Sequence, residues 1–398
     1  MSFAAFTLSR LPRIEFGSGV IGKIPELAAR YGDQALLITG ARSFRQSPHW
    51  NRLVTGLREK GMRTEHFTVS GEPSPQLVDE AVARYFGTGI SVVIAIGGGS
   101  VLDAGKAIAG LLPHGNSVLD HLEGVGRGIP YTGPATPFIA APTTAGTGSE
   151  ATKNAVLSVQ GENGYKKSFR DEALVPEYAV VDPDLLSTCP PALIAADGMD
   201  AFTQLLESYV SLRANPLTDT LAWSGMTAFR DGFFHAWKGG DGEQARQGRA
   251  AIAYASLISG ITLAQVGLGS VHGLAAPLGA FFPIPHGVCC GTLLAEATRI
   301  NLAALAARAP DSPALAKYAR VGRLLSGQTS DSPVSAHAAL LETLTRWQDT
   351  LELPRLRTFG VGLDDIPRIV ANSRGSSMQT NPVVLNDDEA GEIVRRRH

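Results

Sequence analysis

The sequence is poor in cysteine. Its 398 residues include three, Cys189, Cys289 and Cys290, and two of these are adjacent. Three cysteines are too few for a disulfide framework, and their spacing is not that of a metal knuckle. The sequence therefore predicts a protein of a reducing compartment, the cytoplasm.

Long apolar runs and an excess of either charge are also lacking. Nowhere do about 18 uncharged apolar residues follow one another, so neither a membrane span nor a secretory signal is expected. The 35 Lys and Arg residues nearly balance the 37 Asp and Glu residues, and no basic cluster interleaves with aromatic residues ahead of Arg395–Arg397. Nucleic acid and membranes are therefore not expected as partners. Of the classes of function considered, small-molecule chemistry is the one that the composition favours. The chain is also long enough for two domains.

Glycine, in contrast, is concentrated where an apolar segment ends. Residues 92–96 are apolar, three glycines follow, and apolar positions then return at helical spacing, a pattern that predicts a buried strand, a tight turn and a helix. Bare backbone N–H groups at a helix N-terminus suit a phosphate. The alternative is a turn that binds nothing, because the spaced G-x-G-x-x-G fingerprint is missing. The candidate cofactor-binding residues are Gly97, Gly98, Gly99, Ser100 and Asp103.

A second loop, after the apolar residues 137–141, is rich in hydroxyl groups. Small hydroxyl side chains offer hydrogen bonds without bulk to a ribose, a phosphate or a nicotinamide amide. An ordinary capped loop ahead of a helix is the alternative, but two such loops at consecutive strand ends favour a dinucleotide. The candidates in this loop are Thr143, Thr144, Thr147 and Ser149.

The two halves of the chain differ in pattern. Strands are expected at residues 35–39, 66–69, 92–96, 137–141 and 178–182, with helices at 24–31, 50–60 and 75–86 between them. This rhythm predicts a parallel sheet covered by helices, with the ligand at the carboxyl ends of the strands. After Pro190 the patterns are helical. We expect an α/β dinucleotide-binding domain over residues 1–189 and an all-helical metal and substrate domain over residues 190–398.

Four polar side chains in the helical half are candidate metal ligands. Asp200 and Gln204 lie one turn apart on the same face of a predicted helix, and His272 and His286 stand in apolar, glycine-rich sequence. Imidazoles and a carboxylate from separate segments form the usual donor set for Zn²⁺ or Fe²⁺. The alternative is two histidines that are simply hydrogen-bonded in the core.

Taken together, these motifs resemble the iron-containing (group III) alcohol dehydrogenase family over nearly the whole chain. The resemblance implies a dehydroquinate synthase-like architecture and hydride transfer between NAD or NADP and a small alcohol, aldehyde or ketone in a cleft between the domains. It also implies a metal held by Asp200, His272 and His286, and Lys166 as a contact on the nicotinamide side. A homodimer is left open. The segments that carry the resemblance are residues 97–106, 142–152, 181–183, 198–201 and 272–287.

Two positions depart from the family pattern. Gln204 stands where the family has a histidine ligand, and Ala276 where it has the histidine that passes protons to solvent. A glutamine oxygen is a weak metal ligand, so the sequence does not decide whether the protein binds a metal. Without a metal, His272 or His286 would donate a hydrogen bond directly to the carbonyl oxygen of the substrate. The open alternatives are a metal-independent enzyme resembling maleylacetate reductases, a dehydroquinate-synthase-type lyase, and a member that binds nucleotide without catalysis.

Cofactor choice is expected to depend on the end of the strand at residues 35–39. Many family members place an aspartate there, whose carboxylate binds the adenosine ribose and repels a 2′-phosphate. This chain has Gly40, followed by Arg42 and Arg45, which offer charge-assisted hydrogen bonds to a 2′-phosphate. The sequence therefore predicts a preference for NADP over NAD, unless both arginines are merely solvated.

Overall fold

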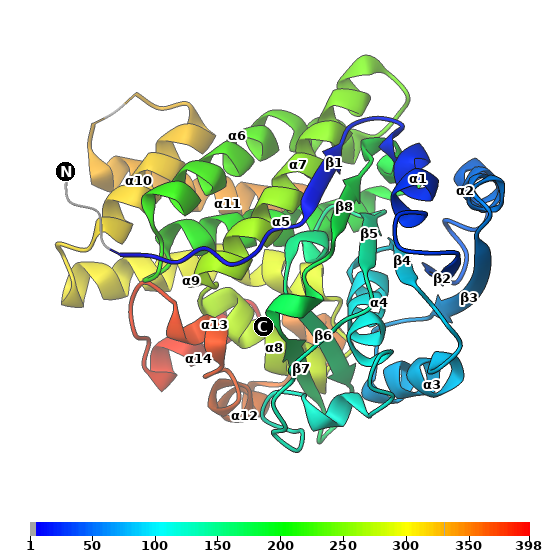
Figure 1. The fold of residues 1–398 in the computed structure, drawn as a ribbon. Helices are drawn as coiled ribbons and strands as arrows, with labels where there is room; N and C mark the ends of the chain where they lie inside the picture. Colours follow the sequence, from blue (N-terminus) through cyan, green and yellow to red (C-terminus); the bar gives the residue numbers. More distant parts are fainter. Residues whose placement is uncertain (1–4, 330) are drawn as a thin grey trace.

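The computed structural model describes residues 5–329 and 331–398, and a six-stranded parallel sheet forms the centre of its first half (Figure 1). The order β1-β8-β5-β4-β2-β3 makes β4 the neighbour of both β5 and β2, so the ends of these three strands lie side by side. The strands are β1 (Arg13–Phe16), β2 (Gln34–Gly40), β3 (Arg63–Val69), β4 (Val92–Gly97), β5 (Phe138–Pro142) and β8 (Tyr178–Val181).

Helices cover both faces of the sheet, as the apolar strands require. Leu36 and Ile38 of β2 pack in one core with α3 and α4, whereas Ala35 and Leu37 pack in another with α1 and α2. The two cores follow from the alternation of side chains along a strand, because neither face is left to water. The helices are α1 (Ile24–Ala28), α2 (Pro48–Glu59), α3 (Pro75–Tyr85) and α4 (Gly99–Leu111).

A separate antiparallel hairpin, which the sequence reading did not predict, lies beside α4. Its strands are β6 (Asn154–Val159) and β7 (Tyr165–Arg170), and Ser158 is paired with Lys166. Ala155 and Leu157 of β6 are fully buried in the core that α4 shares with the sheet. The hairpin therefore holds Lys166 in a fixed place relative to the helix that follows the glycine turn.

The second half is helical, as expected. Pro190 and Pro191 end the first half, and Pro191 begins α5, where its fixed φ and missing N–H suit the first turn of a helix. The helices are α5 (Pro191–Val210), α6 (Pro216–Lys238), α7 (Glu243–Val266), α8 (Ser270–Phe281), α9 (His286–Arg308), α10 (Pro313–Ser326), α11 (Pro333–Thr350), α12 (Ile366–Ala371), α13 (Ser376–Gln379) and α14 (Asp387–Arg396). Short 3₁₀ segments are η1 (Val20–Lys23), η2 (Val118–Asp120), η3 (Ser149–Ala151), η4 (Glu172–Leu174), η5 (Pro183–Thr188), η6 (Leu356–Phe359) and η7 (Leu363–Asp365).

The predicted fold class, an α/β half followed by an all-helical half, is confirmed (Figure 1). Strands give way to helices at Pro191, close to the expected division at 189/190. The division into two domains at residues 189/190 stays a prediction. The first four residues of the expected N-terminal domain lie outside the described part of the chain.

Two helices, α7 and α9, are long and apolar enough by composition to span a membrane. Their most apolar windows are 67% and 72% buried inside the protein, however, and core helices of soluble proteins pass the same test. They are therefore weak support for a membrane span.

Candidate active site

A cavity of about 720 Å³ lies between the carboxyl edge of the sheet and the helical half. It brings together many of the residues singled out from the sequence, from both halves of the chain. The α/β half contributes Gly99, Ser100, Asp103, Thr147, Ser149 and Lys166, and the helical half contributes Gln204, His272, Ala276 and His286. Other candidates lie outside the lining: Gly40, Arg42, Gly97, Gly98, Thr143, Thr144 and the buried Asp200.

The glycine turn and the hydroxyl-rich loop lie against each other. Gly97 is paired with Pro142 across β4 and β5, and the N–H of Thr143 donates to the carbonyl of Gly97 at 2.9 Å. A Cβ at Gly99 would lie 2.8 Å from the side chain of Thr147, which only glycine avoids. The N-cap of α4, Gly98, has no side chain to cap the helix, and its carbonyl accepts from the N–H groups of Val101 and Leu102. The N–H groups that precede these two in the first turn are therefore the ones that suit an anion.

A buried lysine holds the second loop in place. Lys106 Nζ is fully buried and donates to the carbonyl of Ser149, the hydroxyl of Thr152 and the carbonyl of Asn154 at 2.8–2.9 Å. Burial lowers the pKa of Lys106 to about 8, against the attraction of Asp103. Asp103 in turn accepts from the hydroxyl of Ser149 and from a backbone N–H of β6. Asp103 and Ser149 thus shape the cavity wall by bonding to each other.

The end of β2 lies beside the glycine turn. Thr39 is paired with Ile96, so Gly40 lies next to Gly97 at the same edge of the sheet. Arg42 is exposed, and Arg45 is also exposed, with its guanidinium 5.8 Å from the centre of the Trp50 ring. Two cationic groups therefore stand just beyond the edge at which the cofactor is expected.

The candidate metal ligands converge from three helices. Asp200 lies on α5, His272 on α8 and His286 at the first position of α9. His272 Nε2 lies 3.2 Å and His286 Nε2 3.9 Å from Asp200 Oδ1. One further donor joins them: the Sγ of Cys290, so that one ligand atom from each of the four residues lies within 4.8 Å of every other.

The surroundings of the two histidines decide between a metal site and an ordinary hydrogen-bonded core. His272 Nδ1 contacts Glu207 Oε2 at 2.7 Å, an arrangement that fixes the ring and aims Nε2 at the cluster. His286 Nδ1 is buried without a hydrogen-bond partner in the described chain, and its Nε2 has only long contacts. An ion in the cluster would give His286 Nε2 the close partner that it lacks, while Nδ1 would stay unpaired. One carboxylate oxygen and two imidazole nitrogens form a donor set that fits a divalent ion.

Charge in this cluster follows from burial and proximity. Burial alone would raise the pKa of Asp200, but the charges of His286 and His272 and a hydrogen bond from His272 hold it well below its usual range. Burial lowers the pKa of His286 to about 4, although the carboxylate of Asp200 opposes the shift. Burial alone would lower the pKa of His272, but its contacts with Cys290, Asp200 and Glu207 raise it well above its usual range. At neutral pH the empty cluster therefore holds an anionic oxygen, a neutral His286 and a protonated His272, and a bound metal would displace the proton from His272.

Gln204 lies next to the cluster, where its side chain hydrogen-bonds to Asp200, and its amide oxygen is engaged by a residue outside the cluster. Oε1 accepts from the hydroxyl of Ser259 at 3.0 Å, and Nε2 lies 3.4 Å from the carbonyl of Gly146. The amide therefore joins α5 to α7 and to the hydroxyl-rich loop.

Lys166 enters the cavity from β7 together with an acidic partner. Its Nζ lies 3.0 Å from Glu72 Oε1, and the hydroxyl of Ser158 donates to Glu72 Oε2 at 2.6 Å. Both charged residues line the same cavity as His286, and Lys166 is only 13% exposed. Sequence reasoning missed Glu72, Glu207 and Cys290, because each takes its place only through contacts between distant segments.

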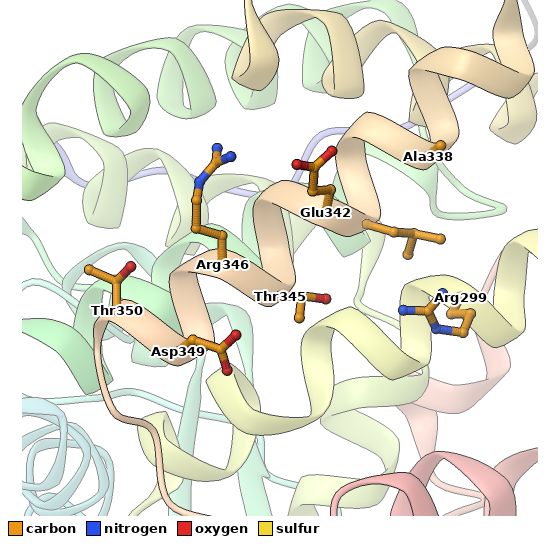
Figure 2. Close-up of a pocket in the computed structure, with 8 residues that line it drawn as sticks. Arg299, Ala338, Glu342, Thr345, Arg346, Asp349 and Thr350 are labelled. Carbon is orange, nitrogen blue, oxygen red and sulfur yellow. The ribbon is translucent and has the colours of Figure 1, made fainter.

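A second depression, of about 560 Å³, lies on the surface between α9 and α11. Figure 2 shows Glu342 and Arg346 pointing to one side of α11, whereas Thr345 and Asp349 point to the other. Polar groups that diverge in this way do not form a binding constellation, so the cavity between the halves is the candidate active site.

The fold and the cavity together define a two-part protein with a ligand site between an α/β half and a helical half. Comparison with known proteins gives the family. The model of "Iron-containing alcohol dehydrogenase" matches residues 12–183, and that of the C-terminal part of the Fe-containing alcohol dehydrogenase family matches residues 194–397. The chain belongs to the iron-containing alcohol dehydrogenase family, and the resemblance seen in its motifs is confirmed.

Alignments with individual relatives cover most of the chain. The 1,3-propanediol dehydrogenase of Klebsiella pneumoniae is 31% identical over 96% of each chain, and the lactaldehyde reductase of Escherichia coli K12 is 32% identical over 89% of each. A crystal structure of a 1,3-propanediol oxidoreductase superposes with a TM-score of 0.89 at 28% identity, covering 99% of this chain and 100% of the other. The protein is accordingly an enzyme that interconverts alcohols with aldehydes or ketones.

Proposed function

We propose that the cavity between the halves catalyses reversible hydride transfer between NADP and a small alcohol or aldehyde. The observation that carries the proposal is the opening of one cavity onto both the N-terminus of α4 and the two histidines of the Asp200 cluster. A dinucleotide with its phosphates at the helix end would extend across the hydroxyl-rich loop toward those histidines. The names of relatives, which include 1,3-propanediol, lactaldehyde and methanol, support a small substrate.

In this proposal Asp200, His272 and His286 hold a divalent ion, Fe²⁺ or Zn²⁺, and Gln204 lies beside them. The ion would supply Lewis-acid polarisation of the carbonyl oxygen. Lys166, positioned by Glu72, lines the same cavity and contacts the nicotinamide side. Ala276 lines the cavity without any group that can carry a proton, and Glu72 and Lys166 are ionisable groups close enough to His286 to act on it electrostatically.

The test is the absorbance of the reduced nicotinamide during incubation with a panel of small aldehydes. Consumption in step with alcohol formation supports the proposal. A lyase of the dehydroquinate-synthase type would use its cofactor only transiently and give no net change, and a member without catalysis would bind the dinucleotide and leave the absorbance unchanged. Activity that survives complete metal removal would favour the metal-independent alternative, in which His272 or His286 donates directly to the carbonyl.

NADP is expected to be preferred over NAD. No carboxylate follows β2 at Gly40, and the exposed Arg42 and Arg45 follow within one short loop, so a 2′-phosphate meets attraction instead of repulsion. Arg42→Ala or Arg45→Ala should lower kcat/KM for NADP by about tenfold, equivalent to ~1.4 kcal/mol, and leave kcat/KM for NAD nearly unchanged. Steady-state kinetics with both cofactors gives the answer; equal use of the two, insensitive to both substitutions, contradicts the preference.

A homodimer is proposed on the basis of the exposed edge of the sheet. β1 is an edge strand, and an unpaired edge with apolar neighbours is a template for a second chain. Ile14 and Phe16 on β1 and Phe6, Leu8 and Leu11 ahead of it are all exposed large apolar residues. Light scattering should give twice the chain mass, and Ile14→Lys should shift the population toward monomer. A monomeric wild type at micromolar concentration would rule the dimer out.

We also propose a cytoplasmic location. The three cysteines, Cys189, Cys289 and Cys290, are all free thiols in the structure, as a reducing compartment would keep them. The substrate partners proposed here are small molecules, in keeping with the near balance of charges.

A further inference from the structure

We propose that Cys290 supplies the fourth protein ligand of the metal site, in the role that the sequence assigns to Gln204, and that the resulting set selects Zn²⁺. The inference rests on the proposed metal-assisted function and concerns which atoms of this chain hold the ion. It gives the site one carboxylate oxygen, two imidazole nitrogens and one thiolate sulfur: Asp200, His272, His286 and Cys290.

The spacing of the donor atoms is the first argument. Ligand bonds of 2.0–2.3 Å around a tetrahedral ion place neighbouring donor atoms roughly 3.3–3.6 Å apart. Cys290 Sγ lies 3.6 Å from His272 Nε2 and 3.8 Å from His286 Nε2. The contacts of Asp200 Oδ1 with the same two nitrogens measure 3.2 and 3.9 Å. Four of the six edges between the donor atoms thus lie close to tetrahedral values, and the other two are within 4.8 Å.

The position of Cys290 on α9 is the second argument. His286 and Cys290 are four residues apart, so their side chains lie on the same face of the helix, one turn from each other. Two ligands at this spacing on one helix are a recurrent way to build a zinc site. The neighbouring Cys289 is equally buried, but its sulfur is not part of the cluster.

The partners of the thiol are the third argument. In the described chain, the hydrogen-bonding contacts of Cys290 Sγ are the two ring nitrogens alone, and its side chain is fully buried. Gln204, the competing ligand, has its oxygen engaged by Ser259 on α7 and its nitrogen near the carbonyl of Gly146. Turning that oxygen toward the ion would bring the amide out of both contacts, whereas the sulfur is already in place.

The chemistry of the donors then indicates the metal. A soft thiolate with imidazoles in tetrahedral arrangement favours zinc over iron(II), which is better served by harder oxygen and nitrogen ligands. Replacement of a missing imidazole by a thiolate also restores the number of strong donors to four. We therefore expect a stoichiometric, slowly exchanging ion, where the sequence alone predicts a weakened site.

The experiment compares wild type with Cys290→Ser, with Cys289→Ser as the matched control on the same helix, and with Gln204→Ala. Each protein is stripped with chelator under reducing conditions, and Zn²⁺ affinity is then measured by competition with a chromogenic chelator. Wild type and Cys289→Ser should bind one equivalent with equal affinity. Cys290→Ser should bind at least about tenfold more weakly, since even loss of a group that only orients a ligand typically costs 10–100-fold.

Cobalt(II) gives a readout that needs no turnover. A thiolate bound to Co²⁺ produces an intense charge-transfer band in the near ultraviolet, which oxygen and nitrogen ligands lack. The band should appear in wild type, Cys289→Ser and Gln204→Ala and be missing in Cys290→Ser. Circular dichroism of the stripped proteins checks that each variant is folded. If Cys290→Ser does not fold, the presence or absence of the band in wild type and in Gln204→Ala still shows whether a thiolate binds the metal.

Several outcomes overturn the proposal: cobalt-loaded wild type without the band, Cys290→Ser with wild-type zinc affinity, or a wild type that binds no ion. Loss of affinity in Gln204→Ala together with an absent band would return the ligand role to Gln204. Failure of hydride transfer with every aldehyde, in a protein that shows the thiolate band, would instead count against the proposed function and leave the ligand assignment intact.

Discussion

Replacing His272 by alanine should lower kcat/KM for the best aldehyde by about 10²–10³-fold, a loss of roughly 3–4 kcal/mol of transition-state stabilisation. The ring is buried, lies 3.2 Å from Asp200 and contacts Glu207 at 2.7 Å, so no neighbouring group can take its place. The effect is expected whether His272 acts as a metal ligand or donates to the carbonyl itself. Steady-state kinetics with excess cofactor measures it.

Glu207→Gln is the graded companion to this substitution. It keeps a hydrogen-bonding group at His272 Nδ1 but removes the charge, so activity should fall by about 10–100-fold, as for other groups that orient a ligand. Glu207 also accepts from the N–H of Val271, which ties it to the start of α8. Thermal unfolding of both variants separates a catalytic loss from a folding defect. A folded His272→Ala enzyme that retains a tenth of wild-type activity would remove His272 from the reaction.

The elements predicted best from the sequence are those whose apolar pattern is uninterrupted. The sequence predicts a buried strand at residues 92–96, and β4 consists of these residues and one more. The prediction succeeds because a central strand of a parallel sheet covered on both faces needs a continuous run of apolar residues. The hairpin β6–β7 was missed because its second strand contains Lys166 and Lys167 and is only partly buried. In the helical half, Gly273, Pro277 and Gly279 interrupt the pattern of α8, so the sequence indicates this helix less clearly than its neighbours.

The candidate site could be read only in part for a similar reason. A spacing of four residues places Asp200 and Gln204 on one helix face, but the direction of the Gln204 oxygen depends on Ser259, 55 residues further along the chain. Cys290 is one turn from His286 in any helix, yet only the packing of α9 against α5 and α8 turns its sulfur toward the other donors. Local periodicity predicts faces, whereas donor directions are decided by contacts between distant elements.

Replacing Gly98 by valine should abolish dinucleotide binding and leave the fold intact. Gly98 is the N-cap of α4, and its φ of −74° and ψ of −179° are open to any residue, so backbone strain plays no part. A Cβ there would lie 3.4 Å from the side chain of Thr144, and the branches of valine would extend into the space between the two loops. A phosphate that approaches the N–H groups of α4 needs that space. We expect Kd to rise at least about a hundredfold, or ~2.7 kcal/mol.

Gly242 offers a matched control, because it is also the N-cap of a helix, α7, with extended backbone at φ −68° and ψ 164°. A Cβ at Gly242 meets no atom of the described chain within 4 Å, and this glycine precedes α7 at the end away from residues 263–265, which line the cavity. Gly242→Val should therefore bind the dinucleotide like wild type, and Gly98→Ala should fall between the two. Titration calorimetry with the reduced cofactor measures all three. Unchanged affinity in a folded Gly98→Val protein would place the phosphates elsewhere, and an equal loss in Gly242→Val would trace the defect to a general cost of valine at a helix N-cap instead of to a blocked phosphate site.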